Sequence, residues 1–208
     1  EQTGPTEIVR AKKSLPSAVN TPVEMNDTII TAKARAQLTF EDNTTVKITE
    51  QSKLVIDDFV YDPKKGSGKI AMKVVLGTAR YASGQIAKTN PQAVDVKTPT
   101  ATVAVRGTDF TATVDELGES TVILLPSCPR TNLLPDEIER LCKTGVIDVI
   151  TDAGQVTLDQ SFQATKVTAR NQPPLKPVKV NLNENGISNI LILAPPQEIK
   201  NAIRQRED

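Results

Sequence analysis

The segment TPTATVAVRGTDFTATV, residues 98–114, arranges its apolar side chains in a way that one uninterrupted strand cannot accommodate. Val105 closes a set of apolar residues at odd positions, whereas Phe110 opens a set at even positions. Successive side chains of a strand point to opposite faces, so a core-facing set changes from odd to even only where the strand is interrupted. The change falls at residues 106–108, Arg-Gly-Thr, and a glycine there indicates a bulge, a corner or a close backbone approach.

Alternating apolar residues recur in short segments through most of residues 28–170, with turn-forming residues about every eight to twelve positions. In KIAMKVVLG the apolar side chains as far as Leu76 are expected on the core face, and GQIAK (residues 84–88) is expected to be another strand. The turn EDN contains Asn43, which tolerates the left-handed backbone conformation. A second change of parity interrupts KLVIDDFVYDP at its two central aspartates. The sequence predicts a mainly β fold, a sandwich or β-roll of short strands.

The composition narrows the functions that the chain can have. Lysine plus arginine and aspartate plus glutamate both number 25, and the aromatic residues are four phenylalanines and two tyrosines. Nucleic-acid-binding domains usually carry a basic excess or stacking aromatics, so no nucleic-acid partner is expected. The absence of histidine removes the commonest general base and metal ligand, so we expect no enzyme and no cofactor or metal. No apolar run is long enough to span a bilayer, so membrane insertion is not expected.

The two cysteines, Cys128 and Cys142, flank the segment PDEIERLCK, whose pattern predicts a short helix with Leu141 and Cys142 on its inward face. Cys142 would then face the strand end LLPSCP that carries Cys128. The pair forms either a disulfide or two buried free thiols. A disulfide would close a loop of about 15 residues, contribute roughly 3 kcal/mol in the chain-entropy model, and indicate an oxidising compartment.

The chain is expected to divide into three parts, which differ in pattern and composition: an extended lead-in (1–22), a β domain with the cysteine-flanked insertion (23–170), and a proline-rich linker with a docking tail (171–208). The tail is too small to form a core of its own. Its last segment, PQEIKNAIRQRED, predicts a terminal helix. The tail therefore packs either on the β domain or on a partner chain, and its candidate docking residues are Ile199, Ala202 and Ile203.

The segment TPTATVAVRGTDF strongly resembles the motif of FecR domains. The residues that fit the motif are Thr98, Pro99, Ala101, Val105, Arg106, Gly107, Thr108 and Phe110. Upstream, TAKARAQLTFEDNTTVKITEQSKLVID and VVLGTARYASGQIAK resemble the preceding parts of the family pattern, with Asn43 where the family usually has glycine. The resemblance covers roughly residues 23–125. It implies a β-rich periplasmic domain of the kind that passes a siderophore signal to a sigma factor.

The later segment, from GESTVILLPSCP to QATKV, looks like the FecR-domain structural proteins of contractile-tailed marine phages. This resemblance implies a non-enzymatic virion component of the tail, neck or baseplate region. Such a component would bind other virion proteins and copies of itself. The alternative is a periplasmic FecR-type signalling module that relays a receptor signal to a sigma-factor system.

Two roles are open for Arg106. In the structural role, its guanidinium donates hydrogen bonds to backbone carbonyls at the interruption of the strand. It also binds a carboxylate through two hydrogen bonds, with Asp109, Asp57 or Asp58 as candidates. In the functional role, it binds an anionic ligand or partner. The structural role is favoured, so the motif residues Thr98, Pro99, Arg106, Gly107, Thr108 and Phe110 are expected to shape the fold rather than a catalytic site.

Overall fold

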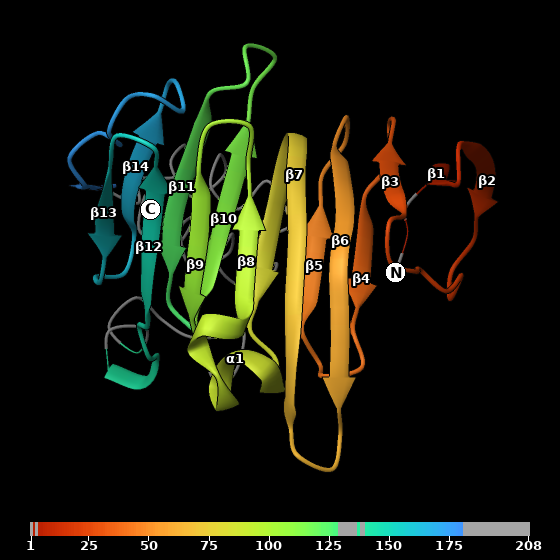
Figure 1. Ribbon diagram of the computed structural model, residues 1–208, viewed down its shortest axis with the longest axis horizontal. Helices are drawn as coiled ribbons and strands as arrows, with labels where there is room; N and C mark the ends of the chain where they lie inside the picture. The colour runs from red at the N-terminus through yellow and green to blue at the C-terminus, as the bar shows by residue number, and fades with distance from the viewer. Residues whose placement is uncertain (1, 3, 129–136, 138–139, 181–208) are drawn as a thin grey trace, which may run out of the picture.

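The computed structural model describes residues 2, 4–128, 137 and 140–180 of the chain. Within them, 15 strands form one continuous hydrogen-bonded sheet that folds over into two facing layers (Figure 1). Neighbouring strands are antiparallel except for β7 and β8, which are parallel. The mainly β class predicted from the sequence is confirmed.

The long sheet contains, in spatial order, β2 (Lys13–Ser17), β1 (Thr6–Arg10), β3 (Thr28–Thr31), β6 (Lys53–Asp62), β7 (Ser67–Ala82), β8 (Val94–Lys97), β9 (Thr102–Arg106), β12 (Val146–Thr151) and β13 (Gly154–Leu158). The short sheet contains β4 (Ala36–Thr39), β5 (Thr45–Ile48), β7 again, β10 (Asp109–Val114), β11 (Ser120–Leu125), β14 (Gln163–Val167) and β15 (Val178–Lys179). A short helix, α1 (Gln85–Thr89), and a 3-10 turn, η1 (Pro91–Ala93), connect β7 to β8.

Strand β7 joins the two layers because it passes from one into the other at Gly77. Its first part pairs with β6 and β8 in the long sheet, and its last part pairs with β5 and β10 in the short sheet. Gly77 has φ +80°, a left-handed conformation that favours glycine. The predicted core position of Leu76 is wrong, since that side chain is exposed where the chain turns.

The core lies between the two layers and forms one continuous cluster of buried apolar side chains. Tyr81 at the end of β7 stacks on Phe110 of β10, with ring centroids 5.3 Å apart. Both rings are fully buried, so the FecR-like motif supplies one of the largest core side chains. Burial of such a ring contributes about 1.5–3 kcal/mol.

The change of parity in residues 98–114 is a change of sheet. Strand β9 pairs with β8 and β12 in the long sheet, whereas β10 pairs with β7 and β11 in the short sheet. Gly107, at φ +62°, lies at the corner between them. The second predicted irregularity has a different cause, because the register of β6 against β7 shifts between Ile56 and Asp58 as a β-bulge within one sheet.

Residues 84–88, expected as a strand, instead include the helix α1. Asp42, fully buried in the turn between β4 and β5, accepts hydrogen bonds from the Ile86 N–H (3.1 Å) and the Thr44 N–H (2.9 Å). The Gln85 N–H donates to the Asp42 carbonyl (2.8 Å). A carboxylate that accepts the first N–H groups of a helix stabilises its start. Asn43 in the same turn has φ +65°, as the sequence predicted.

Both ends of the expected β domain extend further than its predicted bounds. Residues 1–22, expected as an extended lead-in, contain β1 and β2, and β1 pairs with β3 inside the long sheet. The proline-rich segment that follows residue 170 also reaches the sheet, where β15 pairs with β14. The predicted tail helix and its residues Ile199, Ala202 and Ile203 lie outside the described residues. Among the residues that the structure describes, no helix has the length and hydrophobicity needed to cross a bilayer.

The predicted disulfide between Cys128 and Cys142 is confirmed. Residues 137, 140 and 141 are helical, as expected, although Leu141 is exposed rather than directed inward. The disulfide joins the two ends of the insertion between β11 and β12. Next to it, Ser127 and Lys143 form an isolated antiparallel β-bridge.

Replacing both cysteines, Cys128→Ser with Cys142→Ser, is expected to lower the free energy of unfolding by about 2 kcal/mol while the sheet is retained. The reason is that the unfolded chain regains the freedom of the loop, whereas the bridge closes an insertion outside the core. Urea unfolding followed by circular dichroism measures the change, with the oxidised and reduced wild-type chain as matched controls. An unfolded variant in the absence of urea would contradict this expectation.

Candidate functional site

The guanidinium of Arg106 forms an ion pair with Asp148 on the neighbouring strand β12. Asp148 also accepts a hydrogen bond from the Thr157 hydroxyl (2.6 Å), so it lies between two donors. The Arg106 side chain is 56% exposed. The predicted carboxylate partners were therefore wrong: Arg106 pairs across the outer face of the long sheet rather than with Asp109, Asp57 or Asp58.

The hydroxyl groups of Thr98 and Thr108, rather than the guanidinium of Arg106, hold the backbone at the turn before β9 and at the corner after it. The Thr98 hydroxyl accepts from the Ala101 N–H (3.0 Å) and from the Ser120 hydroxyl (2.8 Å). Thr108 is fully buried, and its hydroxyl accepts from the Gly145 N–H (3.2 Å). Pro99 is exposed in the turn between β8 and β9.

Asp109 is the ionisable group of the motif whose environment is most unusual. Burial raises the pKa of its carboxyl above the ordinary value, while the Ser127 hydroxyl, which donates to it at 2.9 Å, acts in the opposite direction. Arg80 approaches its other oxygen at 3.8 Å. Arg80 lies on β7, Asp109 on β10 and Ser127 just after β11. The carboxyl of Asp109 therefore links three neighbouring segments of the short sheet.

Replacing Arg106 by methionine is expected to lower the free energy of unfolding by only about 1 kcal/mol, because its guanidinium is more than half exposed and the buried Asp148 keeps its hydrogen bond from Thr157. Arg170→Met is the matched control, since Arg170 pairs with Asp152 on the surface. Thermal and urea unfolding of both variants measure the two losses. A loss of several kcal/mol for Arg106→Met alone would mean that the arginine holds the corner itself.

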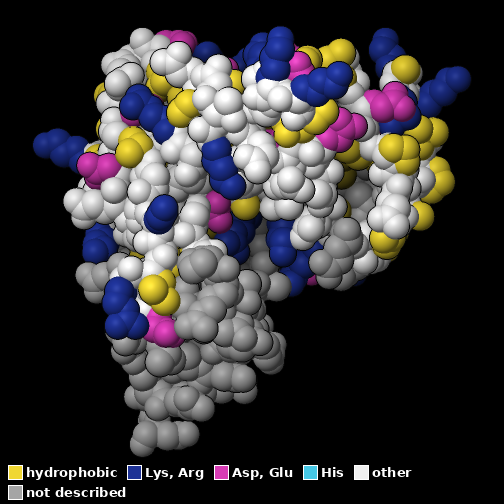
Figure 2. All heavy atoms as spheres, turned by 90° about the horizontal axis from the view of Figure 1, so that it is seen from below, with side chains coloured by type: hydrophobic (Ala, Val, Ile, Leu, Met, Phe, Trp, Pro, Cys, Tyr) yellow, Lys and Arg dark blue, Asp and Glu magenta, His cyan; other side chains and the backbone are white. Residues whose placement is uncertain are grey.

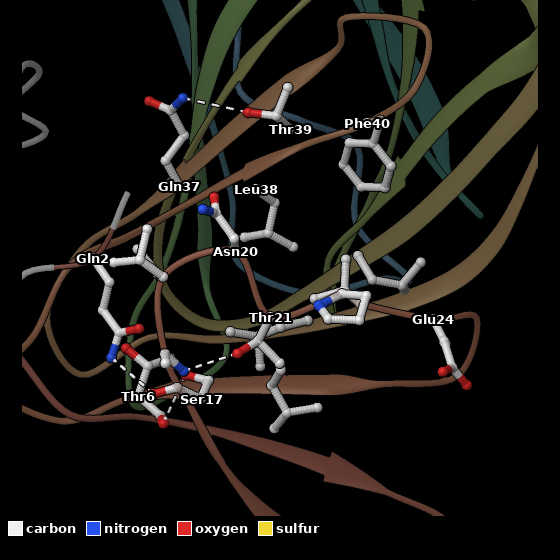
Figure 3. Close-up of a pocket in the computed structure, with 18 of the residues that line it drawn as sticks. Gln2, Thr6, Ser17, Asn20, Thr21, Glu24, Gln37, Leu38, Thr39 and Phe40 are labelled. Atoms are coloured by element: carbon white, nitrogen blue, oxygen red, sulfur yellow. Dashed lines mark hydrogen bonds between the residues drawn. The ribbon is translucent and has the colours of Figure 1, made fainter.

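A second candidate site is a groove of about 600 Å³ at the end of the molecule that carries β1 and β2 (Figure 3). One wall is β4 with the following Phe40, and the other is the loop 17–25 after β2. The floor consists of apolar side chains from both layers: Ile8, Ile29, Leu38 and Ile56, which are buried, and Phe59, which is partly buried. In Figure 2, hydrophobic side chains gather at this end of the molecule beside a hollow. The volume is within the range of ligand and peptide pockets.

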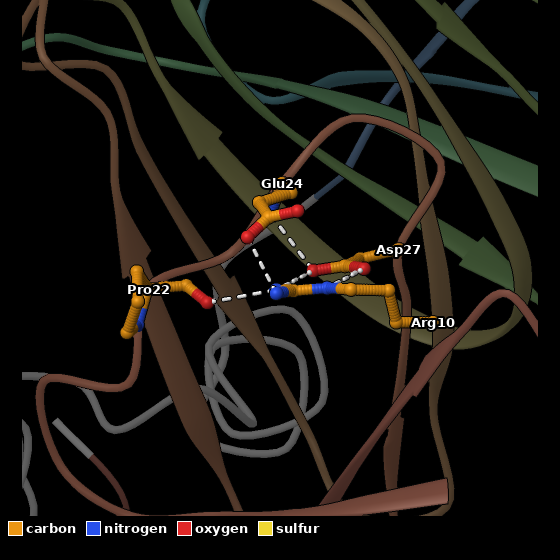
Figure 4. Close-up of polar contacts among 4 residues, drawn as sticks. All are labelled: Arg10, Pro22, Glu24 and Asp27. Carbon is orange, nitrogen blue, oxygen red and sulfur yellow. Dashed lines mark hydrogen bonds and ion pairs between the residues drawn. The ribbon is translucent and has the colours of Figure 1, made fainter. Parts of the chain in front are cut away.

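The loop wall of the groove is held by an ion-pair cluster centred on Arg10 (Figure 4). Its guanidinium donates two hydrogen bonds to Asp27, at 2.8 and 2.7 Å, and a third to the Pro22 carbonyl at 3.1 Å. Glu24 completes the cluster through its own ion pair with Arg10. Asp27 is fully buried, and the hydrogen bonds from Arg10 hold its pKa below the usual range. The wall is therefore fixed before anything binds.

The groove is lined mainly by apolar and uncharged polar side chains. Its lining contains two carboxylates, Glu24 and Glu41, and no basic side chain. Within the described ranges no three His, Cys, Asp or Glu side chains converge in a way that could hold a metal ion. The sequence does not reveal this groove, because its walls come from separate segments, and its one sequence signal is the apolar character of Val19 and Met25 in a loop.

One family model matches the central part of the chain. Residues 27–126 match the family model described as FecR protein. The match runs from the residue before β3 to the residue after β11. It therefore includes Gly77 and Gly107, where the chain passes from one sheet to the other, and the β4 wall of the groove. The loop 17–25 precedes the match. The FecR part of the sequence prediction is confirmed, and the likeness to phage structural proteins stays a prediction.

One solved structure shows a similar fold at low sequence identity. A crystal structure of a candidate anti-sigma factor from Parabacteroides distasonis has a TM-score of 0.50 and 14% identity, covering 77% of this chain and 62% of that chain. A second crystal structure with this description from the same organism has a TM-score of 0.49 and 14% identity, covering 75% and 60%. The chain thus spans less than two thirds of their length, and the likeness concerns the fold alone. No curated protein matches the chain by sequence.

Proposed function

We propose that this chain is a FecR-type signalling domain of the periplasm, which binds another protein and relays the state of a receptor to a sigma-factor system. The observation that carries the proposal is the FecR match over residues 27–126. The fold shared with a candidate anti-sigma factor supports it. The comparisons give no support to the virion role expected from the later part of the sequence.

The disulfide between Cys128 and Cys142 supports the proposed location. Structural disulfides persist in oxidising spaces such as the periplasm and are rare in the reducing cytosol.

The domain works by binding rather than by chemistry. The sequence contains no histidine. The hydroxyl groups of Thr98 and Thr108 in the FecR motif are engaged in hydrogen bonds within the fold. The surface of the domain is therefore the part that recognises a partner. On the face seen in Figure 2, basic and acidic side chains are interspersed, so a protein partner suits it better than a polyanion.

Deleting the gene in the cell that expresses the chain tests this proposal. We expect altered transcription of the genes that depend on one sigma factor, restored by a plasmid copy with both cysteines. In the complemented strain, cross-linking of the tagged chain is expected to capture the periplasmic part of a receptor, which an equally tagged unrelated periplasmic protein does not. Unchanged transcription, together with recovery of the chain from purified phage particles by mass spectrometry, would overturn the proposal in favour of the virion role.

A further inference from the structure

Strand β4, which forms one wall of the groove, has neighbours on both sides. It pairs with β5 on one side, and on the other side Gln2 forms an antiparallel β-bridge to Ala36. The N-terminal segment thus lies where a further strand would pair. A peptide that entered the groove would leave its own N–H and C=O groups against apolar side chains, which is costly. A ligand with a hydrocarbon body has no such groups, so a small amphipathic molecule suits the groove better than a peptide.

The groove presents a preformed apolar surface to such a molecule. Ile29, Leu38 and Ile56 line it although they belong to the core, where each is at most 6% exposed. On the loop wall, Val19 and Met25 also line the groove, and they are 60% and 55% exposed. Because the ion-pair cluster already fixes this wall, binding requires little ordering of the protein.

The two ends of the groove differ in charge. In Figure 3, Glu24 and Phe40 lie toward one end, and Gln2 and Ser17 lie toward the other. Glu41, which follows Phe40 in the chain, is exposed and also lines the groove. Of the described residues that line the groove, none is a lysine or an arginine. One end is therefore acidic, whereas the other offers an uncharged amide and a hydroxyl group.

The acidic end keeps an excess of negative charge in spite of the arginine beside it. Arg10 carries one positive charge and pairs with two carboxylates, those of Asp27 and Glu24. Glu41 adds a further carboxylate to this end of the lining. Opposite charges attract and like charges repel, so the groove favours a cationic head group over a carboxylate or a phosphate.

Two aromatic rings add to the attraction for a cation at this end. Phe40 and Phe59 both line the groove, and their ring centroids lie 5.1 Å apart. The faces of aromatic rings carry partial negative charge and attract ammonium groups. Carboxylates and aromatic rings together are the groups that recognise an organic cation.

We propose that the groove binds a small amphipathic molecule with a hydrocarbon body and an amine or quaternary ammonium head. The body lies on the apolar floor between the two layers, and the head lies at the end that carries Glu24 and Glu41. This inference goes beyond the proposed signalling function, because it gives the domain a ligand of its own, and its test needs no receptor.

Three probes with the same alkyl chain and different heads test the class of ligand. Octylammonium, 1-octanol and octanoate carry positive, zero and negative charge at neutral pH. Titration calorimetry of the purified full-length chain is expected to give octylammonium a Kd of about 1 mM or below, and octanoate a Kd at least about tenfold higher, with octanol between them. Because this preference is electrostatic, added salt is expected to reduce it. Changes of amide signals in NMR spectra are expected in the loop 17–25 and in β4.

One variant tests the head group. Glu41→Gln is expected to weaken the binding of octylammonium about threefold to fivefold and to leave octanol unchanged, because one exposed carboxylate is lost. Glu41 is chosen over Glu24 because it lies outside the cluster that holds the loop wall. Glu116→Gln, in the exposed turn between β10 and β11, is the matched control and is expected to bind all three probes as the wild type does.

A second variant tests the hydrocarbon body. Val19→Ser with Met25→Ser removes apolar contacts from the loop wall and is expected to weaken all three probes about tenfold. Val60→Ser with Leu117→Ser is the matched control, because these two side chains are apolar and are 60% and 86% exposed outside the groove. Its affinities are expected to equal those of the wild type.

Failure of octylammonium to bind would overturn the proposal, whether the full-length chain fills the groove itself or the groove closes. Equal affinity for octanoate, or changes of amide signals away from the groove, would overturn it as well. Each of these results would leave the signalling function standing, since that function rests on the FecR match and not on the groove.

Discussion

Gly77→Ala is expected to unfold the domain or to lower its free energy of unfolding by about 3–5 kcal/mol. The methyl carbon would lie 2.2 Å from the Ser52 hydroxyl oxygen and 2.7 Å from the Ser52 Cα. Ser52 is buried, and its hydroxyl accepts from the Thr78 N–H at 3.2 Å, so relief of the clash requires a shift of backbone. The left-handed conformation adds about 1–2 kcal/mol for any residue with a Cβ, and overpacking adds about 1–3 kcal/mol or more.

Gly118→Ala separates the cost of the left-handed conformation from the cost of the clash with Ser52. Gly118 has φ +81°, almost the same as Gly77, but its added methyl carbon meets only the Pro99 Cβ at 3.7 Å. This variant is expected to lose only the conformational part, about 1 kcal/mol. Urea unfolding of both variants provides the comparison. Equal losses would mean that the close approach of β7 to Ser52 does not determine where the sheet folds over.

Residues 98–114 show both what the sequence predicted and where that prediction ended. Alternation of apolar residues identified the strands and located the interruption at Gly107. The same signal, a change of parity, was produced by a change of sheet at Gly107 and by a bulge at Asp57. Local alternation records only which face is buried, and both events exchange the faces. The partner strands decide between them, and those lie far away in the sequence.

The first 22 residues were assigned to a lead-in because prolines and a missing period hid their strands. Pro16 lies in β2, the edge strand of the long sheet, where the absent N–H costs no bond in the sheet. With that hairpin unrecognised, the groove that it helps to form could not be predicted either.

Arg106 is the arginine that the sequence motif singles out, whereas the arginine with the most hydrogen-bond partners is Arg10. Arg106 reaches Asp148, 42 residues away, on an exposed face, whereas Arg10 reaches the buried Asp27 with two hydrogen bonds. Neither partner lies at a spacing that local structure dictates. Of the expected partners, Asp109 lies beyond the corner at Gly107 in the other sheet, and Asp57 and Asp58 lie on β6, which is not a neighbour of β9.

Asp27→Ala is expected to lower the free energy of unfolding at neutral pH by about 2 kcal/mol, since the buried carboxylate accepts two hydrogen bonds from the charged guanidinium of Arg10, and these are lost. Asp27 also accepts from the Glu24 N–H at 2.8 Å, so the loop wall of the groove loses its anchor together with the pair. Asp152→Ala is the matched control, because its pair with Arg170 is exposed and is expected to contribute less than about 1 kcal/mol.

The pH dependence distinguishes the charge of Asp27 from its packing. The hydrogen bonds from Arg10 lower the pKa of Asp27 in the folded chain, so the unfolded chain binds the proton more readily. The stabilisation is complete above the unfolded pKa of about 3.9 and is lost as the pH falls from there through the folded pKa. The difference between the wild type and Asp27→Ala is therefore expected to shrink below about pH 4, measured by urea unfolding at several pH values. A difference that stays constant down to pH 2 would assign the effect to packing, and the groove wall would then stand without its ion pair.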